Sequence, residues 1–593
     1  MPSSSLAASS LNKLINQLKD NGSSPKADHK IALEVLLETL EAGLNDNLSQ
    51  HYFLSAIDPG IGKSLAVSKF LQVWKERNFT PASSVLIGLS RLQEIEGYLK
   101  NSGLNKEDVA VLTSDHTYKE LGVPKEDHPS ARVMFTTQQM IERRTRDKSF
   151  ADAEEFHFEG EPRSLRIWDE SLIPAAHLVV HADEIAALPL VLRKAFPQLA
   201  DTAHHLNGRI YSSEAGQRIT IPAEFGKLPD GIRSIRNAKA IETLEALSRL
   251  AGQELEPVAI GDGIAELAGA AAPLPEDFAP VVVLDASGRV RSTYRVWEQT
   301  GGPLRRLPEV TKDYGNLRVY LWERRVGKAP LKLPGTVEEV VTAISDLIEE
   351  DRTDDQWLII SYKEPSIERQ LREALRSDVN TRMHFLTWGM HHGTNEFKDC
   401  RKVVLVGQMS YGAGGYRALA SACGASDPDK ATLAELERGE YRHHLLQALT
   451  RASVRYNRHG QSGTCTAHII ASPNLGMHDA IAQAFPGCAV ERWCPDEKDL
   501  GGKVGKLIKL LQSARNQGMR RITKKELRDA LGIAAANFSR LLGHREVTSW
   551  LDQNHVRVDR REFILWPTFE PLPGDGFTID QLDYLDENLE PET

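Results

Sequence analysis

Apolar residues occur along the chain in short, strand-sized runs that are separated by longer stretches with helical periodicity. In the first half, such runs lie at residues 84–89, 109–112, 132–135 and 165–168. The alternation of buried strands with helices is typical of a parallel β-sheet that helices cover on both faces. We therefore predict a first α/β domain over residues 29–287.

A second series of the same kind follows. LRVYLW begins at Leu317, QWLIISY at Gln356, MHFLTW at Met383, KVVLVG at Lys402 and TAHIIAS at Thr466. This pattern predicts a second α/β domain over residues 288–495. Between the two series, residues 172–280 are rich in Ala and Leu and read as a helical insertion, which ends where Val281–Asp285 restores a strand.

Both ends of the chain differ from this alternation. Residues 1–28 are rich in Ser, Asn and Lys and predict a partly helical, loosely held, flexible leader. Residues 503–568 read as helix, turn at Gly532, second helix, and a two-stranded wing with its tip at Asp559. This unit resembles a small α+β winged-helix domain. The remaining residues, 569–593, form an acidic tail.

Charge is distributed unevenly along the 593 residues, whose formal net charge is −10. From Lys503 to Arg561 there are 14 Lys or Arg against 5 Asp or Glu, whereas residues 570–593 contain 8 acids and no Lys or Arg. A basic unit of this kind favours contact with nucleic acid. The tail could cover that basic surface or recruit a protein partner, although terminal acidic runs are usually only solvated.

Other function classes are disfavoured. No apolar run approaches the roughly 20 residues that span a bilayer, so no membrane association is expected, and the amino terminus lacks the features of a secretion signal. A cytoplasmic location is therefore expected. The five cysteines form no CxxC pair, which argues against a disulfide framework and against a zinc or iron–sulfur site.

Gly60-Ile61-Gly62-Lys63-Ser64 stands between a predicted strand and a predicted helix, as in a phosphate-binding loop. In such a loop, Gly60 and Gly62 let backbone N–H groups surround phosphate oxygens, Lys63 reaches the β- and γ-phosphates, and the Ser64 hydroxyl binds magnesium. The usual pattern has Gly or Ala five residues before Gly62, where this chain has Ile57. A glycine turn without a nucleotide is the alternative.

An acidic pair follows the strand at residues 165–168, about a hundred residues after Lys63. Asp169 could hold magnesium and Glu170 could polarise the attacking water. Such a pair alone is usually a solvated strand end. Its position in the same predicted domain as Lys63 favours a site for Mg²⁺ and a nucleoside triphosphate.

From about residue 30 to 495 the chain resembles the superfamily 2 helicases, whose two RecA-like domains clamp ATP. Residues 85–91 and 133–139 look like the family's strand-contacting motifs, so the resemblance implies that Arg91, Thr136 and Thr137 grip a nucleic-acid backbone. Residues 281–287 look like the motif that links hydrolysis to movement. In residues 392–395, the resemblance places Gly393 against nucleotide and Thr394 against the strand. Each short motif taken singly could also be a plain strand end or loop.

Gln447–Arg455 resembles the last motif of that family, in which arginines reach the γ-phosphate from the second domain. Arg451 and Arg455 are four residues apart rather than the usual three, and Arg458 follows, so the identity of the arginine finger stays open. Positions four apart share one face of a helix. A basic, solvated helix face is the alternative.

In the winged-helix-like unit, Asn537 and Arg540 are expected to face a DNA groove, and Lys524, Lys525, Arg560 and Arg561 to meet phosphates. A protein-docking role for this unit is the alternative. Together these features predict an ATP- and Mg²⁺-dependent helicase or translocase that acts on nucleic acid, DNA rather than RNA. The alternative function is a nucleotide-switched, DNA-binding regulatory ATPase without unwinding activity.

Overall fold

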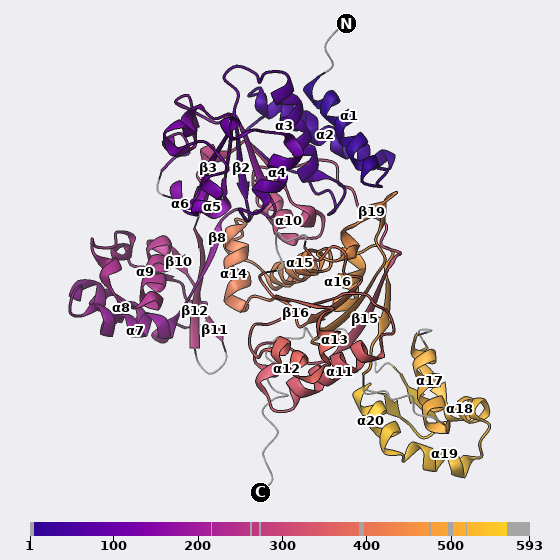
Figure 1. Ribbon diagram of the computed structural model, residues 1–593. Coiled ribbons are helices and arrows are strands. Elements are labelled where there is room, and N and C mark those ends of the chain that lie inside the picture. Colours follow the sequence, from indigo (N-terminus) through magenta and orange to yellow (C-terminus); the bar gives the residue numbers. More distant parts are fainter. Residues whose placement is uncertain are drawn as a thin grey trace. The chain divides into compact units, whose positions relative to one another are not determined.

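The computed structural model describes residues 5–565, except 147, 215, 261–263, 272–273, 391–395, 474–475, 496–501, 517–518 and 555. The chain divides into two compact units, residues 1–493 and 494–593. Figure 1 shows both units with their elements labelled. The two units are described separately.

The first unit contains a seven-stranded sheet in the order β14-β1-β13-β7-β2-β4-β3, and its paired strands all run parallel. Its strands are β1 (Tyr52–Leu54), β2 (Val85–Leu89), β3 (Val109–Leu112), β4 (Val133–Thr137), β7 (Leu165–Asp169), β13 (Val281–Leu284) and β14 (Leu304–Arg306). Near-continuous apolar runs form most of these strands, because both faces of the sheet are buried there; the edge strand β14, Leu304–Arg306, is the exception. The predicted first RecA-like domain is confirmed, but β14 extends its sheet beyond the predicted boundary at residue 287.

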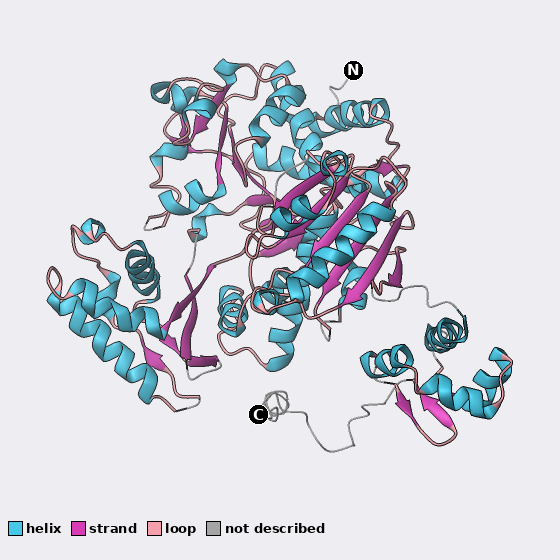
Figure 2. Ribbon diagram, turned by 60° about the horizontal axis from the view of Figure 1, so that its bottom comes forward, coloured by secondary structure: helices cyan, strands magenta, loops and turns pink. Residues whose placement is uncertain are grey.

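A second parallel sheet has six strands in the order β17-β16-β18-β21-β15-β22. These are β15 (Leu317–Glu323), β16 (Trp357–Ser361), β17 (Met383–Thr387), β18 (Lys402–Val406), β21 (Cys465–Ala471) and β22 (Ala489–Arg492). Helices lie against this sheet (Figure 2), among them α15 (Lys430–Leu449) and α16 (Met477–Ala484), whose buried side chains join its core. The second RecA-like domain is confirmed.

The amino-terminal segment differs from the loosely held leader that the sequence predicted. Helices α1 (Leu6–Asp20) and α2 (Ala27–Leu44) pack with α3 (Lys63–Glu76), the helix that follows the glycine loop. Leu14 is fully buried and Leu18 is 5% exposed, in the same core as the first sheet. Apolar residues at helical spacing give α1 one buried face, which holds the segment in place.

The insertion within the first domain is only partly helical. It contains helices α7 (Ala182–Leu192), α8 (Pro197–Ser212) and α9 (Ala238–Leu250), as predicted. It also contains an antiparallel sheet of β8 (Ala176–His181), β11 (Pro257–Ile260) and β12 (Ile264–Ala271). The sequence of β12 is rich in alanine, which favours a helix, but pairing with β8 overrides that preference. The small side chains of β12 let α14 (Ala413–Ala422) of the second domain pack close by.

The second unit has a core of apolar side chains from four helices and a three-stranded antiparallel sheet. Its elements are α17 (Gly502–Asn516), β23 (Arg521–Thr523), α18 (Lys524–Leu531), α19 (Ala535–Leu542), α20 (Arg545–Gln553), β24 (Arg557–Val558) and β25 (Glu562–Ile564). The predicted wing corresponds to β24 and β25, and β23 completes the sheet. Its identity as a winged helix stays a prediction. The acidic tail lies outside the described residues.

Among the described helices, none combines the length and apolarity that would span a membrane.

Candidate nucleotide site

The glycine loop leads from β1 to α3, whose amino-terminal cap is Gly62. Gly60 has a φ of 83° and Gly62 a φ of 128°. Residues with a Cβ atom rarely adopt positive φ angles, whereas glycine adopts them readily. A Cβ atom at Gly60 would lie 1.8 Å from the backbone oxygen of Arg455. Glycine is therefore required at position 60 because the loop turns directly against the second domain.

Lys63 and Ser64 stand where a phosphate loop needs them. The Lys63 ammonium donates to the backbone carbonyl of Ile57, and burial lowers the pKa of Lys63 to about 8. The Ser64 hydroxyl donates to Oδ2 of Asp169 over 3.2 Å. The departure at Ile57 has a structural reason, because its side chain is fully buried and its backbone pairs with Val310. A glycine there could still form the backbone bridge but would lose the packing of the buried side chain.

The acidic pair at the end of β7 faces the glycine loop. Asp169 also accepts a hydrogen bond from the Tyr98 hydroxyl, and burial raises its pKa to about 6. Glu170 has a φ of 92°, an unusual value for a residue other than glycine. Strained backbone of this kind persists where the surrounding structure enforces it, often at functional sites. Here it accompanies a Glu170 side chain that lines the same cavity as Lys63.

Two arginines of the second domain reach this site. Arg451, which follows α15, is buried. Its guanidinium lies 3.6 Å from a carboxylate oxygen of Glu170. Arg455 lines the same cavity, and burial together with the charge of Arg451 lowers its pKa to about 10. Arg458 is exposed on β19 (Asn457–Arg458) and is not among the lining residues. The structure thus brings Arg451 and Arg455, not Arg458, to the acidic pair.

The cavity between these groups has a volume of about 570 Å³, within the usual range for small-molecule sites. Both domains line it, and so does a segment to which the sequence analysis assigned no chemistry. Leu18, Asn21 and Ser23, at the end of α1 and beyond it, face the glycine loop. The signal that could have identified this segment was the helical spacing of Leu14 and Leu18.

Glu94 is a further residue that the sequence analysis missed. It begins α4 (Glu94–Ser102), its Oε2 is buried without a hydrogen-bond partner, and burial with the charges of Asp169 and Glu170 raises its pKa to about 9. Nothing in the local sequence marks Glu94, because the fold alone brings it to the acidic pair.

The donor set suits Mg²⁺, which takes few protein oxygens and completes its shell with waters and phosphates. Ser64 and Asp169 supply a hydroxyl and a carboxylate that already lie within hydrogen-bond distance. Among the described residues, no cluster of three His, Cys, Asp or Glu side chains forms a ready-made metal site. This pattern fits a metal that arrives with a nucleotide.

The predicted strand-contacting residues have different surroundings. Arg91 donates to the backbone oxygen of Met390 in the second domain over 2.7 Å. Thr136 is fully buried and donates to the carbonyl of Leu112 on the neighbouring strand β3. Its contact with nucleic acid stays a prediction. Thr137 is partly exposed but caps α6 (Gln138–Arg144). Gly393 and Thr394 lie outside the described residues.

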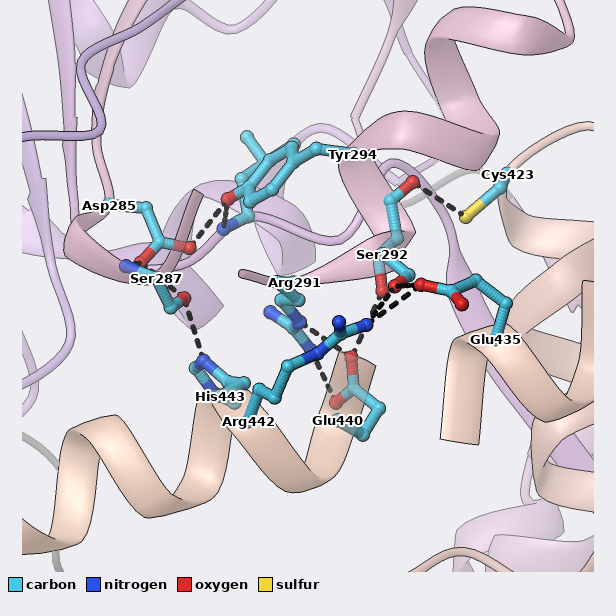
Figure 3. Close-up of polar contacts among 12 residues, drawn as sticks. Asp285, Ser287, Arg291, Ser292, Tyr294, Cys423, Glu435, Glu440, Arg442 and His443 are labelled. Carbon is cyan, nitrogen blue, oxygen red and sulfur yellow. Dashed lines mark hydrogen bonds and ion pairs between the residues drawn. The ribbon is translucent and has the colours of Figure 1, made fainter. Parts of the chain in front are cut away.

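A chain of hydrogen bonds connects the end of β13 with α15 (Figure 3). Asp285 accepts from the backbone and hydroxyl of Ser287, and the Ser287 hydroxyl lies 2.7 Å from Nδ1 of His443. Nearby, Arg291 makes a buried, bidentate pair with Glu440 at 2.7 and 2.9 Å. The predicted linking motif therefore joins the first domain to the helix that leads to Arg451.

In the second unit, the predicted contact residues lie on α18, α19 and the β24–β25 turn. Lys524 is partly buried, with its ammonium 6.0 Å from the centre of the Phe563 ring. The others are exposed: Lys525, Asn537, Arg540, Arg560 and Arg561. Their contact with nucleic acid stays a prediction.

No family model and no curated protein matches the sequence. Among solved structures, S. tokodaii Xpd4 shares 12% identity over 77% of this chain and 99% of that chain, with a TM-score of 0.42. S. cerevisiae Dbp5 bound to RNA and ADP BeF3 shares 12% identity over 88% and 97%, with a TM-score of 0.39. The DUF1998 helicase MrfA bound to DNA shares 10% identity over 96% of this chain and 60% of that chain, with a TM-score of 0.37. The strand orders of its two parallel sheets give this chain a fold of two RecA-like domains.

Proposed function

We propose that the protein is an ATP-hydrolysing motor that acts on nucleic acid, as a helicase or translocase. One observation carries the proposal. Lys63, Ser64, Asp169 and Glu170 of the first domain and Arg451 and Arg455 of the second line a single cavity. A phosphate loop, an acidic pair and arginines from a second domain are the parts that phosphoryl transfer to water requires.

Each group has a role in hydrolysis. Lys63 would exchange the carbonyl of Ile57 for the β- and γ-phosphates, and Ser64 with Asp169 would hold Mg²⁺. When bound, Mg²⁺ neutralises charge on the phosphate oxygens. Glu170 orients and polarises the attacking water, and its ion pair with Arg451 opens as that arginine turns to the γ-phosphate. Because the two halves belong to different sheets, nucleotide binding favours closure of the domains and product release favours opening.

Basic surfaces support nucleic acid as the partner. Besides the exposed cations of the second unit, a cavity of about 550 Å³ lies at the end of β3, which neighbours β4 in the sheet. Five cations line it, with Glu120 as the acidic residue: Lys106, Lys119, Lys125, Arg143 and Arg144. Such a concentration of positive charge suits a phosphodiester backbone. DNA is the preferred substrate in this proposal.

The first test is an ATPase assay with single-stranded DNA, double-stranded DNA and RNA in parallel. We expect stimulation by at least one of them, with DNA the strongest. Hydrolysis that no nucleic acid changes, together with a nucleotide-dependent change in DNA affinity or oligomeric state, would favour the regulatory ATPase instead. Absence of any hydrolysis by the wild-type protein would refute both.

Two variants test the site itself. Lys63→Ala removes the phosphate-binding ammonium and should abolish hydrolysis, whereas Glu170→Gln should keep ATP bound but uncleaved. The exposed residues Lys30 and Glu96, which do not line the cavity, provide the controls Lys30→Ala and Glu96→Gln, which should hydrolyse ATP as fast as the wild type. Retained hydrolysis in Lys63→Ala would show that this cavity is not the nucleotide site.

A further inference from the structure

Residues 307–316 connect the two sheets and touch functional segments on both sides. Toward the first domain, Val310 pairs with Ile57 in a parallel bridge, and the backbone N–H of Asp58 donates to the Val310 carbonyl over 3.0 Å. Toward the second domain, Asp313 pairs with Gln461 of β20 (Gln461–Ser462), which forms a hairpin with β19 and follows the Arg455 segment. Isolated backbone bridges therefore hold the connection between the glycine loop and the arginine-bearing segment.

Asp58, two residues before Gly60, binds the connection on the side of the first domain. Its carboxylate is fully buried and accepts from the Arg289 guanidinium at 2.8 Å and the Tyr314 hydroxyl at 2.7 Å. The backbone N–H of Lys312 is a third donor, at 2.9 Å. A buried carboxylate is stable only when its oxygens are satisfied in this way. The position of the glycine loop is thus fixed directly to the backbone of the connection.

The side chain of Lys312 binds the segment of the second domain that contains Arg455. Lys312 is 2% exposed, and its ammonium donates to the carbonyls of Val454, Arg455 and Tyr456 at 2.8, 3.0 and 3.3 Å. The Arg455 carbonyl is the same atom against which Gly60 packs. Lys312 therefore binds both sides of the cleft. Its backbone N–H donates to Asp58 beside the glycine loop, and its ammonium donates to the backbone segment that carries Arg455.

We infer that Lys312 is a positioning residue, which sets the place of the Arg455 guanidinium relative to the nucleotide by holding three consecutive carbonyls of its segment. This inference rests on the proposed ATPase function. Three carbonyls converging on one point suit an ammonium, whose three donors radiate from a single nitrogen. A planar guanidinium spreads its donors over a fork and cannot reproduce this geometry.

The kinetic consequence follows from when an arginine finger acts. Charge neutralisation at the γ-phosphate matters most in the transition state, so misplacing Arg455 should lower kcat and leave ATP binding nearly unchanged. Misplacement of a reacting group by about 1 Å can cost on the order of 100-fold in rate. A residue that only supported the fold would instead change stability or binding.

The test is steady-state ATP hydrolysis by the full chain with Lys312→Met, which keeps the length of the side chain but not its donors. We expect kcat to fall on the order of 100-fold, with KM changed less than about threefold. Lys328→Met, at an exposed lysine of the same domain, is the matched control and should behave as the wild type. The double variant Lys312→Met/Arg455→Ala should be no slower than Arg455→Ala alone, because both changes remove the same contribution.

Several outcomes would overturn the inference: unchanged kcat in Lys312→Met, a rise in KM alone, or losses that multiply in the double variant. If Lys312→Met does not fold, Lys312→Arg carries the test, because it keeps the charge and the N–H to Asp58. We expect an intermediate loss of kcat from Lys312→Arg, and full activity would contradict the positioning role. A wild-type protein without ATPase activity would refute the proposed function itself, which is a separate result.

Discussion

At the scale of single residues, burial determines what several ionisable side chains do. His468 on β21 is 6% exposed, stacks on Tyr320 with ring centres 5.0 Å apart, and leaves its Nδ1 without a hydrogen-bond partner. Burial, assisted by the positive charge of Lys402, lowers the pKa of His468 to about 3. The folded protein therefore keeps this imidazole neutral through the range in which an unfolded chain would protonate it.

The lowered pKa of His468 predicts that the folded protein becomes less stable as the pH falls. Between pH 6.5 and about 3, His468 is protonated in the unfolded state but neutral in the folded state. Protonation therefore favours unfolding, so the stability that neutral His468 contributes above pH 6.5 is lost as the pH falls. Between pH 7.5 and pH 5, we expect the free energy of unfolding of the wild type to fall by about 2 kcal/mol more than that of His468→Phe. Denaturant unfolding at the two pH values measures it. His478→Phe, at an exposed histidine, is the control and should follow the wild type; an equal fall in all three proteins would contradict the prediction.

The residues of the nucleotide site show where local sequence was sufficient. Lys63, Ser64, Asp169 and Glu170 were predictable because each follows a strand in a recognisable local order, and the parallel strands bring their ends to one edge of the sheet. The burial of Thr136 was not predicted, because the sequence did not show that both faces of β4 are covered at that position. Glu94 and Lys312 carried no local signal, because their partners are distant in the chain.

At the scale of elements, strand-sized apolar runs predicted both parallel sheets, since strands buried on both faces leave a strong pattern. Alanine-rich β12 was missed because its pairing with β8 is a long-range interaction that overrides local preference. The polar composition of residues 1–28 concealed the apolar stripe of α1. The helix is short and depends on packing against α2 and α3 for its stability.

The packing of α1 can be tested by a single truncation. Leu14→Ala removes a fully buried side chain and should lower the free energy of unfolding by about 2–5 kcal/mol. Asn16→Ala, at an exposed position of the same helix, should change it by less than about 0.5 kcal/mol. Thermal or denaturant unfolding is the measurement. A Leu14→Ala protein as stable as Asn16→Ala would mean that α1 is loosely held, as the sequence first indicated.

At the scale of the whole molecule, the candidate nucleotide site and the basic stretch at residues 503–561 lie in different compact units. The cavity with Lys63 and Arg455 belongs entirely to residues 1–493, whereas Lys525, Arg560 and Arg561 belong to residues 494–593. The predicted boundary near residue 495 matches this division because the polar, Gly- and Pro-containing stretch there interrupts the apolar pattern.

Removal of residues 494–593 should therefore separate the two properties. We expect the shortened protein to keep its unstimulated ATPase rate within about twofold, because no residue of the cavity is lost. Its affinity for DNA should decrease, and the salt dependence of binding should become less steep as phosphate contacts disappear. ATPase assays and DNA titrations at two salt concentrations measure these effects. Unchanged DNA affinity would assign the second unit to protein docking.

Two of the several connections between the RecA-like domains affect how the cleft can open. One is the connection at residues 307–316; the other is the insertion of the first domain, whose β12 packs on α14 of the second and whose Glu256 pairs with Arg417 at 2.8 Å. Both attachments must be kept or broken when the two domains separate. We therefore expect them to limit the directions in which the cleft can open.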